Sequence, residues 1–534
     1  STRLSGGSLY DIINEGSATG GRLNSDKGGG GKSSGGKGKS DSGSDFRFFA
    51  PNESWFDFNG KVIYHINDKQ NLNFSFYIGQ DSAMTVGLTE WGNRAALLRW
   101  ENRFATKWLS NTSLIYSRYY TANIAGIYHF HSGVSTQSFK QEFSYFPNPN
   151  NEVRFGLMSE YQDYNHGSLE DATQEDGGKF MPGMQGLESA FYIENDQKIN
   201  DRLSAYYGLR YSLYHQLGPG DRFTYDDITN EPIEAEFFSE KTDVMSSYSS
   251  LEPRLAITYL LSGQNSLKFS YNRNAQYLRL MSLGAEIEWY DIWMPTTKNI
   301  KPMLTDQFAM GYFHNFNNNE IQFSAETYYK ILNGAADFED GLHNYLVDNL
   351  EAYVATGKGL AYGFEMSIEK PSGRFNGRLS YNYGKSDYQI DVINQGRWYP
   401  YRFDKTHSLT MLSNFQITKD LSISSTFLYS TGRPVTLPEG YYHISGIPFP
   451  YWEGRNKYRL PDYHRLDLGI KYSPNFLIRW TRGLKTTIDV ALYNVYDRRN
   501  IHTINFNQGQ NRLFEQIGQS TYGFMPSINI NVEF

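Results

Sequence analysis

The C-terminal stretch of the chain alternates strictly between polar and apolar residues. Within 525–534, Ile528 and Ile530 alternate with Asn529 and Asn531. Successive side chains of a β-strand point to opposite faces of a sheet, so this pattern predicts a strand between two different surroundings. The chain must therefore fold so that one face of this strand meets an apolar medium and the other face meets water.

The same period of two recurs along most of the chain. It begins at Trp55 and returns in many later segments, among them 203–213, 267–271, 359–369, 375–383, 421–429 and 466–472. We expect roughly 19 or 20 strands of about 10 to 13 residues, the length of tilted membrane strands. No apolar run approaches the roughly 20 residues of a membrane-spanning helix.

The connections between these strands alternate between short and long. Turns such as DKQN and KPSG separate long segments at 81–90, 121–133, 165–185, 216–249, 276–302, 333–352, 389–402 and 431–462. Barrels of bacterial outer membranes have short turns at one end and long loops at the other. The prediction is an all-β fold, a transmembrane antiparallel up-and-down β-barrel of about 20 to 22 strands.

Composition narrows the function classes. The chain has 42 tyrosines and 35 phenylalanines, yet its mean hydropathy is -0.58, so apolar and polar residues are interleaved. The absence of cysteine excludes disulfides and thiolate metal sites. A formal net charge of -7 argues against nucleic acid as a partner.

Two regions are expected. Residues 1–54 combine a partial first strand with a mobile external loop rich in glycine, serine and lysine, and residues 55–534 form the barrel. Residues around Gly31 and Ser33 match the spacing of a nucleophile elbow and part of a phosphate-binding loop. Both matches lie in this low-complexity run, where such matches are common, so we assign neither motif. No serine–histidine arrangement can be inferred from the spacing, so we expect no enzyme activity.

The alternation also assigns faces. In 359–369, Leu360, Tyr362 and Phe364 are expected to face lipid, whereas the intervening residues face the lumen. The polar residues predicted to face the lumen are Arg210, Glu326, Glu365, Glu369, Arg378, Arg465 and Asp467.

Aromatic residues are dense in the long connections. Those proposed to bind a ligand are Trp289, Tyr290, Trp293, Trp398, Tyr399, Tyr441, Tyr442, Tyr451 and Trp452. Exposed aromatics at such density mark binding surfaces, and the alternative is that the long loops pack on one another. His129 and His131 share a face but form an incomplete ligand set, so no metal site and no cofactor are predicted.

Three stretches carry a resemblance to a known family. They are GKGLAYGFE at 357–365, YPYRFDKTH at 399–407 and YNVYDRRN at 493–500, to which the terminal Phe534 is added. The chain resembles the barrel of a TonB-dependent outer-membrane receptor, especially of the kind common in the Bacteroidetes. The resemblance implies a Gram-negative outer membrane, a lipid bilayer around the barrel, an N-terminal plug domain in the lumen and the TonB complex as a partner.

The implied function is energised uptake of a specific ligand, whether siderophore, glycan or peptide. No segment before Trp55 is long enough for a plug, so we expect that the plug either lies outside this sequence or has been lost. The alternative is a structural barrel without transport, which anchors a surface lipoprotein or an outer-membrane assembly complex. These two hypotheses differ in whether a ligand crosses the lumen.

Overall fold

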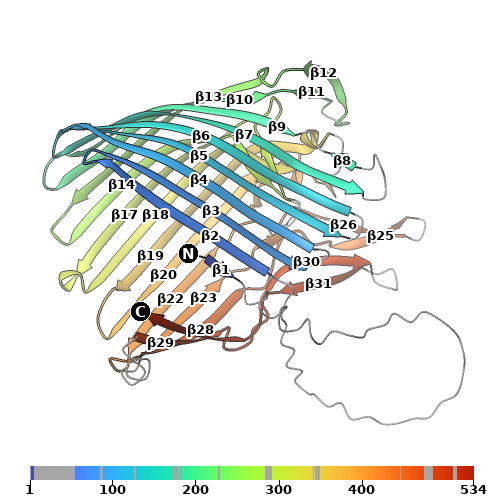
Figure 1. Cartoon of the computed structure of the whole chain (residues 1–534). Helices are drawn as coiled ribbons and strands as arrows, with labels where there is room; N and C mark the ends of the chain where they lie inside the picture. Colours follow the sequence, from blue (N-terminus) through green and yellow to red (C-terminus); the bar gives the residue numbers. More distant parts are fainter. Residues whose placement is uncertain are drawn as a thin grey trace, which may run out of the picture.

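A computed structural model describes most of the barrel region (Figure 1). The described residues are 2–4, 54–84, 88–125, 128–171, 178–180, 183–226, 229–282, 291–340, 342, 349–444, 447–473, 485–508 and 514–533. Most of residues 1–54 lie outside them, so the expected division of the chain at residue 54 stays a prediction.

Among the described residues, one antiparallel sheet of 22 strands forms the wall. Almost every strand pairs with its neighbours along the chain, and the sheet curls so that β2 to β7 cross in front of β17 to β22 (Figure 1). This is the predicted up-and-down barrel. Its strands are β1 (Thr2–Leu4), β2 (Ser54–Asn67), β3 (Gln70–Met84), β4 (Leu88–Ala105), β5 (Trp108–Ala125), β6 (Tyr128–Asn148), β7 (Asn151–Asp171), β8 (Gly178–Phe180), β9 (Met184–Lys198), β10 (Leu203–Leu217), β13 (Val244–Leu260), β14 (Asn265–Gln276), β17 (Met303–Phe316), β18 (Ile321–Phe338), β19 (Val354–Lys370), β20 (Phe375–Gln389), β21 (Tyr399–Pro400), β22 (His407–Gln416), β23 (Leu421–Ser430), β28 (Tyr463–Tyr472), β29 (Lys485–Tyr493) and β32 (Met525–Glu533).

In the part of the chain that the structure describes, ten further strands form five two-stranded sheets outside the wall. The pairs are β11 (Gly220–Tyr225) with β12 (Pro232–Phe238), β15 (Leu278–Met281) with β16 (Ile292–Pro295), β24 (Pro434–Val435) with β27 (Tyr458–Arg459), β25 (Gly440–Ile444) with β26 (Ile447–Tyr451), and β30 (Ile501–Gln508) with β31 (Phe514–Ser520). Three 3-10 helices, η1 (Asn317–Asn319), η2 (Leu350–Tyr353) and η3 (Asn394–Gly396), complete the described elements. No helix in the described part of the chain is long and apolar enough to cross a membrane.

The strands near the N-terminal side are longer than predicted. Strands β4 and β5 have 18 residues each, and β6 and β7 have 21. The connections expected at 81–90 and 121–133 are therefore wrong, because strand pairing continues through most of both segments. Polar residues near the ends of these strands interrupt the apolar pattern but not the backbone ladder.

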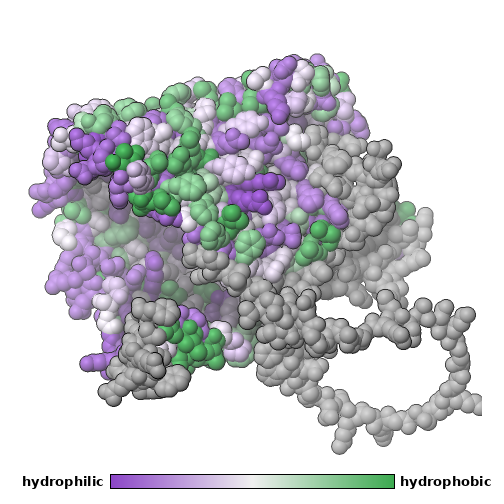
Figure 2. All heavy atoms as spheres, in the orientation of Figure 1, coloured by the Kyte–Doolittle hydropathy of each residue, from purple (hydrophilic) through white to green (hydrophobic). Residues whose placement is uncertain are grey.

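The two faces of the wall differ in exposure. On β10, the exposed side chains of Tyr207, Leu209 and Tyr211 alternate with the less exposed Arg210 and Ser212. We infer that the exposed apolar side chains form the outer face, because a closed sheet buries its polar positions toward its interior. Figure 2 shows hydrophobic residues gathered along the wall of β2 to β7 and hydrophilic residues at its short-turn end.

One of the stretches that carry the family resemblance, 493–500, contains a residue that shapes a turn. Asn494 follows β29 with a positive φ of 52° and is fully buried. Its side-chain amide donates to the carbonyls of Arg498 (2.9 Å) and Tyr522 (3.1 Å). Asparagine tolerates this backbone conformation and supplies local hydrogen bonds, so it fixes the turn that leads into the last long connection.

Candidate functional site at the mouth of the barrel

The long connections all lie at one end of the wall, which we call the mouth. Hairpin β15–β16 belongs to the connection between β14 and β17, yet β16 contacts β6 and β7. Those strands precede it by more than 100 residues and lie in another part of the wall (Figure 1). The hairpin therefore reaches across the mouth instead of standing above its own strands.

An apolar cluster holds this hairpin in place. It comprises Met281, Ile292, Met294, Ile300, Phe338, Leu350 and Val354. These residues come from the hairpin and the stretch after it that holds Ile300, from the end of β18, and from η2 with the start of β19, so three segments of the chain share one small core. Burial of several large apolar side chains stabilises such a core, and the hairpin is accordingly anchored at the mouth by packed structure.

A second cluster and an ion-pair network join the later loops. Tyr388, Ile390, Ile393 and Tyr399 are buried together with Ala335. Beside them, the Arg455 guanidinium donates to Asp337 at 3.0 Å, and the Tyr399 hydroxyl donates to the same carboxylate at 3.2 Å.

The same network reaches the loop that follows β20. The Asn394 backbone N–H donates to Asp340 at 3.1 Å, and the Asn394 side-chain oxygen accepts from the Arg455 N–H at 3.2 Å. Charge-assisted hydrogen bonds of this kind are the stronger ones in proteins. They lock together the connections after β18, β20 and β23.

Hairpin β15–β16 also carries buried donors without partners. The side chain of Arg279 is almost fully buried, and its Nε and one terminal nitrogen bond to no acceptor among the described residues. Trp293 Nε1 is likewise buried and bonds to no acceptor among the described residues. Burial lowers the pKa of Arg279 to about 10, because a charged group loses solvation away from water.

The predicted ligand-binding aromatics are placed differently from one another. Trp398, Tyr442, Tyr451 and Trp452 are exposed, with 40% to 53% of their surface accessible. Tyr399 is only 1% exposed and packs in the second cluster, so the expectation of an exposed ring is wrong there. Its hydroxyl reaches Asp337, a partner that the sequence does not indicate.

The structure gives less support to the four remaining predicted aromatics. Trp293 lies in β16 and is partly buried, and Tyr441 lies in β25. Trp289 and Tyr290 lie outside the described residues. A role for these four residues in binding stays a prediction.

A surface hollow of about 320 Å³ adjoins Trp398. Arg397, Lys457 and Glu453 also line it, together with the backbone around Gly454. Residues of the loop after β20 and of the loop after β26 line this hollow together. An aromatic ring beside two cations can bind a flat or anionic group by stacking and charge.

The predicted lumen residues pair mostly with one another or with unpredicted partners. Arg210 bonds Glu188 at 2.7 Å and approaches Glu252 at 3.8 Å. Arg378 lies 3.7 Å from Glu369, and Arg465 lies 2.9 Å from Asp467. The pairs of Arg210 and Arg465 are mostly buried, whereas the side chain of Arg378 is 53% exposed.

Two of the acids predicted to face the lumen lie opposite each other, and two acids that pair with or approach Arg210 were not predicted. Glu326 and Glu365 stand directly opposite each other on β18 and β19. Glu188 and Glu252 were not predicted, although the alternation on β9 and β13 contained the necessary signal. No group of three or more histidines or acids in the described part of the chain could hold a metal ion, and His129 and His131 lie in β6.

The fold and the covered mouth can now be compared with known proteins. Residues 4–495 match the family described as TonB dependent receptor-like, beta-barrel. The chain belongs to this family. Receptors of the TonB-dependent family are transporters and not enzymes, and the match does not specify a bacterial group.

Solved structures share the fold of this TonB-dependent receptor barrel. The FrpB iron transporter from Neisseria meningitidis has a TM-score of 0.62 at 11% identity, over 91% of this chain and 74% of that one. The ferric yersiniabactin uptake receptor FyuA from Yersinia pestis has a TM-score of 0.60 at 14% identity, over 90% and 71%.

The alcaligin outer membrane receptor FauA from Bordetella pertussis is similar with a TM-score of 0.54 at 10% identity. The alignment covers 83% of this chain but only 66% of FauA, so this chain spans less than two thirds of that receptor. No curated protein matches the sequence.

Proposed function

We propose that this chain is the transmembrane barrel of an outer-membrane receptor that takes up a specific ligand through TonB. The observation that carries the proposal is the family match over residues 4–495. The packed mouth supports it, because a passive pore would have no reason to cover its entrance with a folded hairpin. The family match does not favour the alternative of a structural barrel without transport.

The proposal includes the surroundings and partners of the barrel. The exposed apolar outer face lies in the lipid bilayer of a Gram-negative outer membrane, and the mouth faces the exterior. A plug domain fills the lumen and pairs with the inward charges Arg210, Glu365, Arg378 and Arg465. A barrel of this many strands encloses more space than its own side chains fill, and polar walls need polar partners.

Ligand recognition is assigned to the mouth. The exposed rings of Trp398, Tyr442 and Trp452 meet the ligand first, and hairpin β15–β16 must move before the ligand enters the lumen. The solved neighbours include an alcaligin receptor and a ferric yersiniabactin uptake receptor. A siderophore, a glycan and a peptide all remain candidates, because aromatic and cationic loop residues suit each of them.

The test is uptake by cells with and without TonB. Labelled ferric siderophores, oligosaccharides and peptides are offered separately, and accumulation of one class that requires both this protein and TonB is expected. The native protein is also inserted into a planar bilayer, where no steady current is expected because the lumen is filled. Steady conductance together with TonB-independent entry of all three classes would refute the receptor function.

A further inference from the structure

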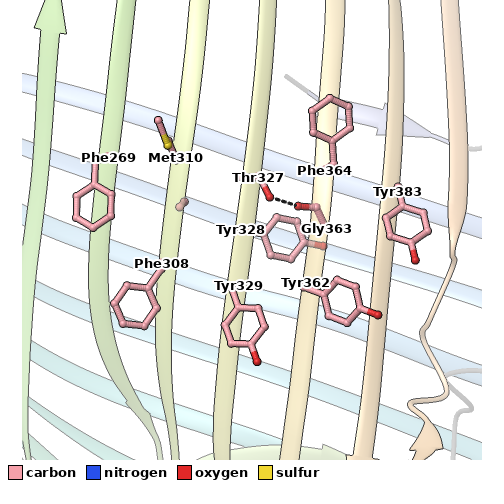
Figure 3. Close-up of a pocket in the computed structure, with 11 residues that line it drawn as sticks. Phe269, Phe308, Met310, Thr327, Tyr328, Tyr329, Tyr362, Gly363, Phe364 and Tyr383 are labelled. Carbon is pink, nitrogen blue, oxygen red and sulfur yellow. Dashed lines mark hydrogen bonds between the residues drawn. The ribbon is translucent and has the colours of Figure 1, made fainter.

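The outer wall contains a hollow of about 520 Å³ over strands β14, β17, β18, β19 and β20 (Figure 3). Figure 3 shows the rings of Phe308, Tyr329 and Tyr362 around it, with Phe364 at its far end. This hollow lies on the apolar outer face and is separate from the mouth. Nothing in the proposed uptake of a ligand uses it.

Short side chains on β18 create the hollow. Thr327 stands between Met310 and Phe364 in register, and its hydroxyl donates to the carbonyl of Gly363 at 2.9 Å. Because that hydroxyl is satisfied by the backbone, the residue offers a methyl group to the outside. Ala325 follows on the same face between Tyr312 and Met366. These two short side chains form a strip along β18 between the large side chains of β17 and β19, which we call the groove. Thr327 lines the hollow, and Ala325 lies two residues before it on the same face.

The end of the groove nearest the mouth is bounded by a row of rings and one cation. Phe308, Tyr329 and Tyr362 are consecutive partners in register across three strands, and Lys385 is the next partner in the row. Tyrosines at this height are typical of the belt where a barrel passes from hydrocarbon to headgroups. The groove is thus apolar along its length and polar at one end.

Three cations lie at that polar end. Arg273 bonds Asp306 at 2.8 Å and Lys385 approaches Asp387 at 3.4 Å, while Lys358 on β19 is exposed. The cationic side chains are about 40% exposed, at 40% for Arg273 and 41% for Lys385, but the two carboxylates only 13% and 15%. Lys358 and Lys385 are therefore the cations left to meet an external anion, because the Arg273 guanidinium donates from two of its nitrogens to Asp306.

We propose that this groove binds an anionic phospholipid, with one acyl chain along β18 and the phosphate against Lys385 and Lys358. The proposal rests on the placement of the outer face in a bilayer. Strands lie about 4.8 Å apart, so the walls on β17 and β19 are separated by about 10 Å. A helix with its side chains is itself about 10 to 12 Å wide and cannot enter, whereas an acyl chain can.

The test measures lipid retention after reconstitution. The protein is inserted into phosphatidylcholine vesicles that contain phosphatidylglycerol, extracted gently and examined by native mass spectrometry. We expect retained phosphatidylglycerol on the wild-type protein and about tenfold less on Ala325→Phe, which fills the groove. The matched control is Ala96→Phe, an outward alanine between Phe76 and Tyr116 on the other part of the wall, which should retain lipid normally.

A second set of variants tests the headgroup without changing the groove. Each of Lys385→Gln and Lys358→Gln should reduce the preference for phosphatidylglycerol over phosphatidylcholine by about fivefold. Lys330→Gln, which removes a cation from the inner face of β18, should leave that preference unchanged.

The possible results of these experiments distinguish failure of the lipid site from failure of the proposed receptor function. Equal retention by wild type, Ala325→Phe and Ala96→Phe, or retention by none of them, would overturn the lipid site and leave the receptor proposal intact. Equal retention of the two lipids by wild type would overturn the role of the cations. Failure of the protein to float with the vesicles would refute the membrane placement, and with it both proposals.

Discussion

Glu326 on β18 stands directly opposite Glu365 on β19, with Asn382 of β20 as the next partner in register. Directly opposed residues of an antiparallel pair have side chains about 5 Å apart. Two carboxylates at this distance repel each other unless water or a partner separates them. The pair therefore marks a wet or occupied part of the lumen, next to the apolar outer position Phe364.

The neighbouring residues Phe364 and Glu365, which are assigned to opposite faces of β19, give the first prediction. Phe364→Arg places a charge on the outer face and should lower the free energy of unfolding by about 2 to 4 kcal/mol near the middle of the bilayer. Glu365→Gln should leave that free energy unchanged or slightly raise it, because it relieves repulsion with Glu326. Reversible unfolding in lipid vesicles measures both values. Equal losses would show that the assignment of faces is wrong.

The second prediction concerns the loop network. Arg455→Met removes the donor to Asp337 and leaves that buried carboxylate with fewer partners. Loss of a hydrogen bond between charged groups costs about 1.5 to 3 kcal/mol, so the loops after β18 and β23 should be cut faster by a protease. Lys457→Met, which disrupts only exposed pairs with Glu439 and Glu453, is the control and should be cut at the wild-type rate.

The third prediction concerns Arg279, whose removal, unlike that of Arg455, should stabilise the protein. Arg279→Met replaces a buried guanidinium that lacks two partners with an apolar chain of similar length. Unpaired buried donors cost about 1 to 3 kcal/mol each, so hairpin β15–β16 should become more stable. Slower amide hydrogen exchange in 278–281 and 292–295 is the expected readout. Faster exchange than in wild type would mean that the guanidinium supports the closed hairpin.

The fourth prediction is a pH dependence at η2. Burial raises the pKa of Glu351 above its usual value of 4.5, against opposing hydrogen bonds from Thr297, Asn299 and Tyr225. The folded mouth therefore binds this proton more tightly than the unfolded chain does. Stability from this group is fully present below about pH 4.5 and decreases as the pH rises through the raised pKa.

Hydrogen exchange around Val354 should consequently be faster at pH 8 than at pH 5, after correction for the intrinsic exchange rate. Glu351→Gln removes the titrating group and should abolish the difference. A Glu351→Gln protein with the same pH dependence as wild type would assign the effect to another residue.

The sequence by itself determined the architecture of the wall and predicts its two faces. Period-two alternation is a local property, since each strand must present apolar side chains to one medium and polar side chains to another. The final strand, the antiparallel order and the concentration of long connections at one end all follow from such local patterns. The strand ends at 81–90 and 121–133 did not follow, because polar residues there are compatible with either a loop or an extended ladder.

Only the tertiary structure decided what the long connections do. The bond from Arg455 to Asp337 joins residues 118 positions apart, and β16 reaches strands that lie far from it in the sequence. Neither contact has a repeating pattern that a sequence can display. Tyr399 shows the consequence, because its ring looks like an exposed loop aromatic in the sequence but is buried against Asp337 and Tyr388. Burial of a loop residue depends on which distant segment folds over it, and long-range packing alone fixes that choice.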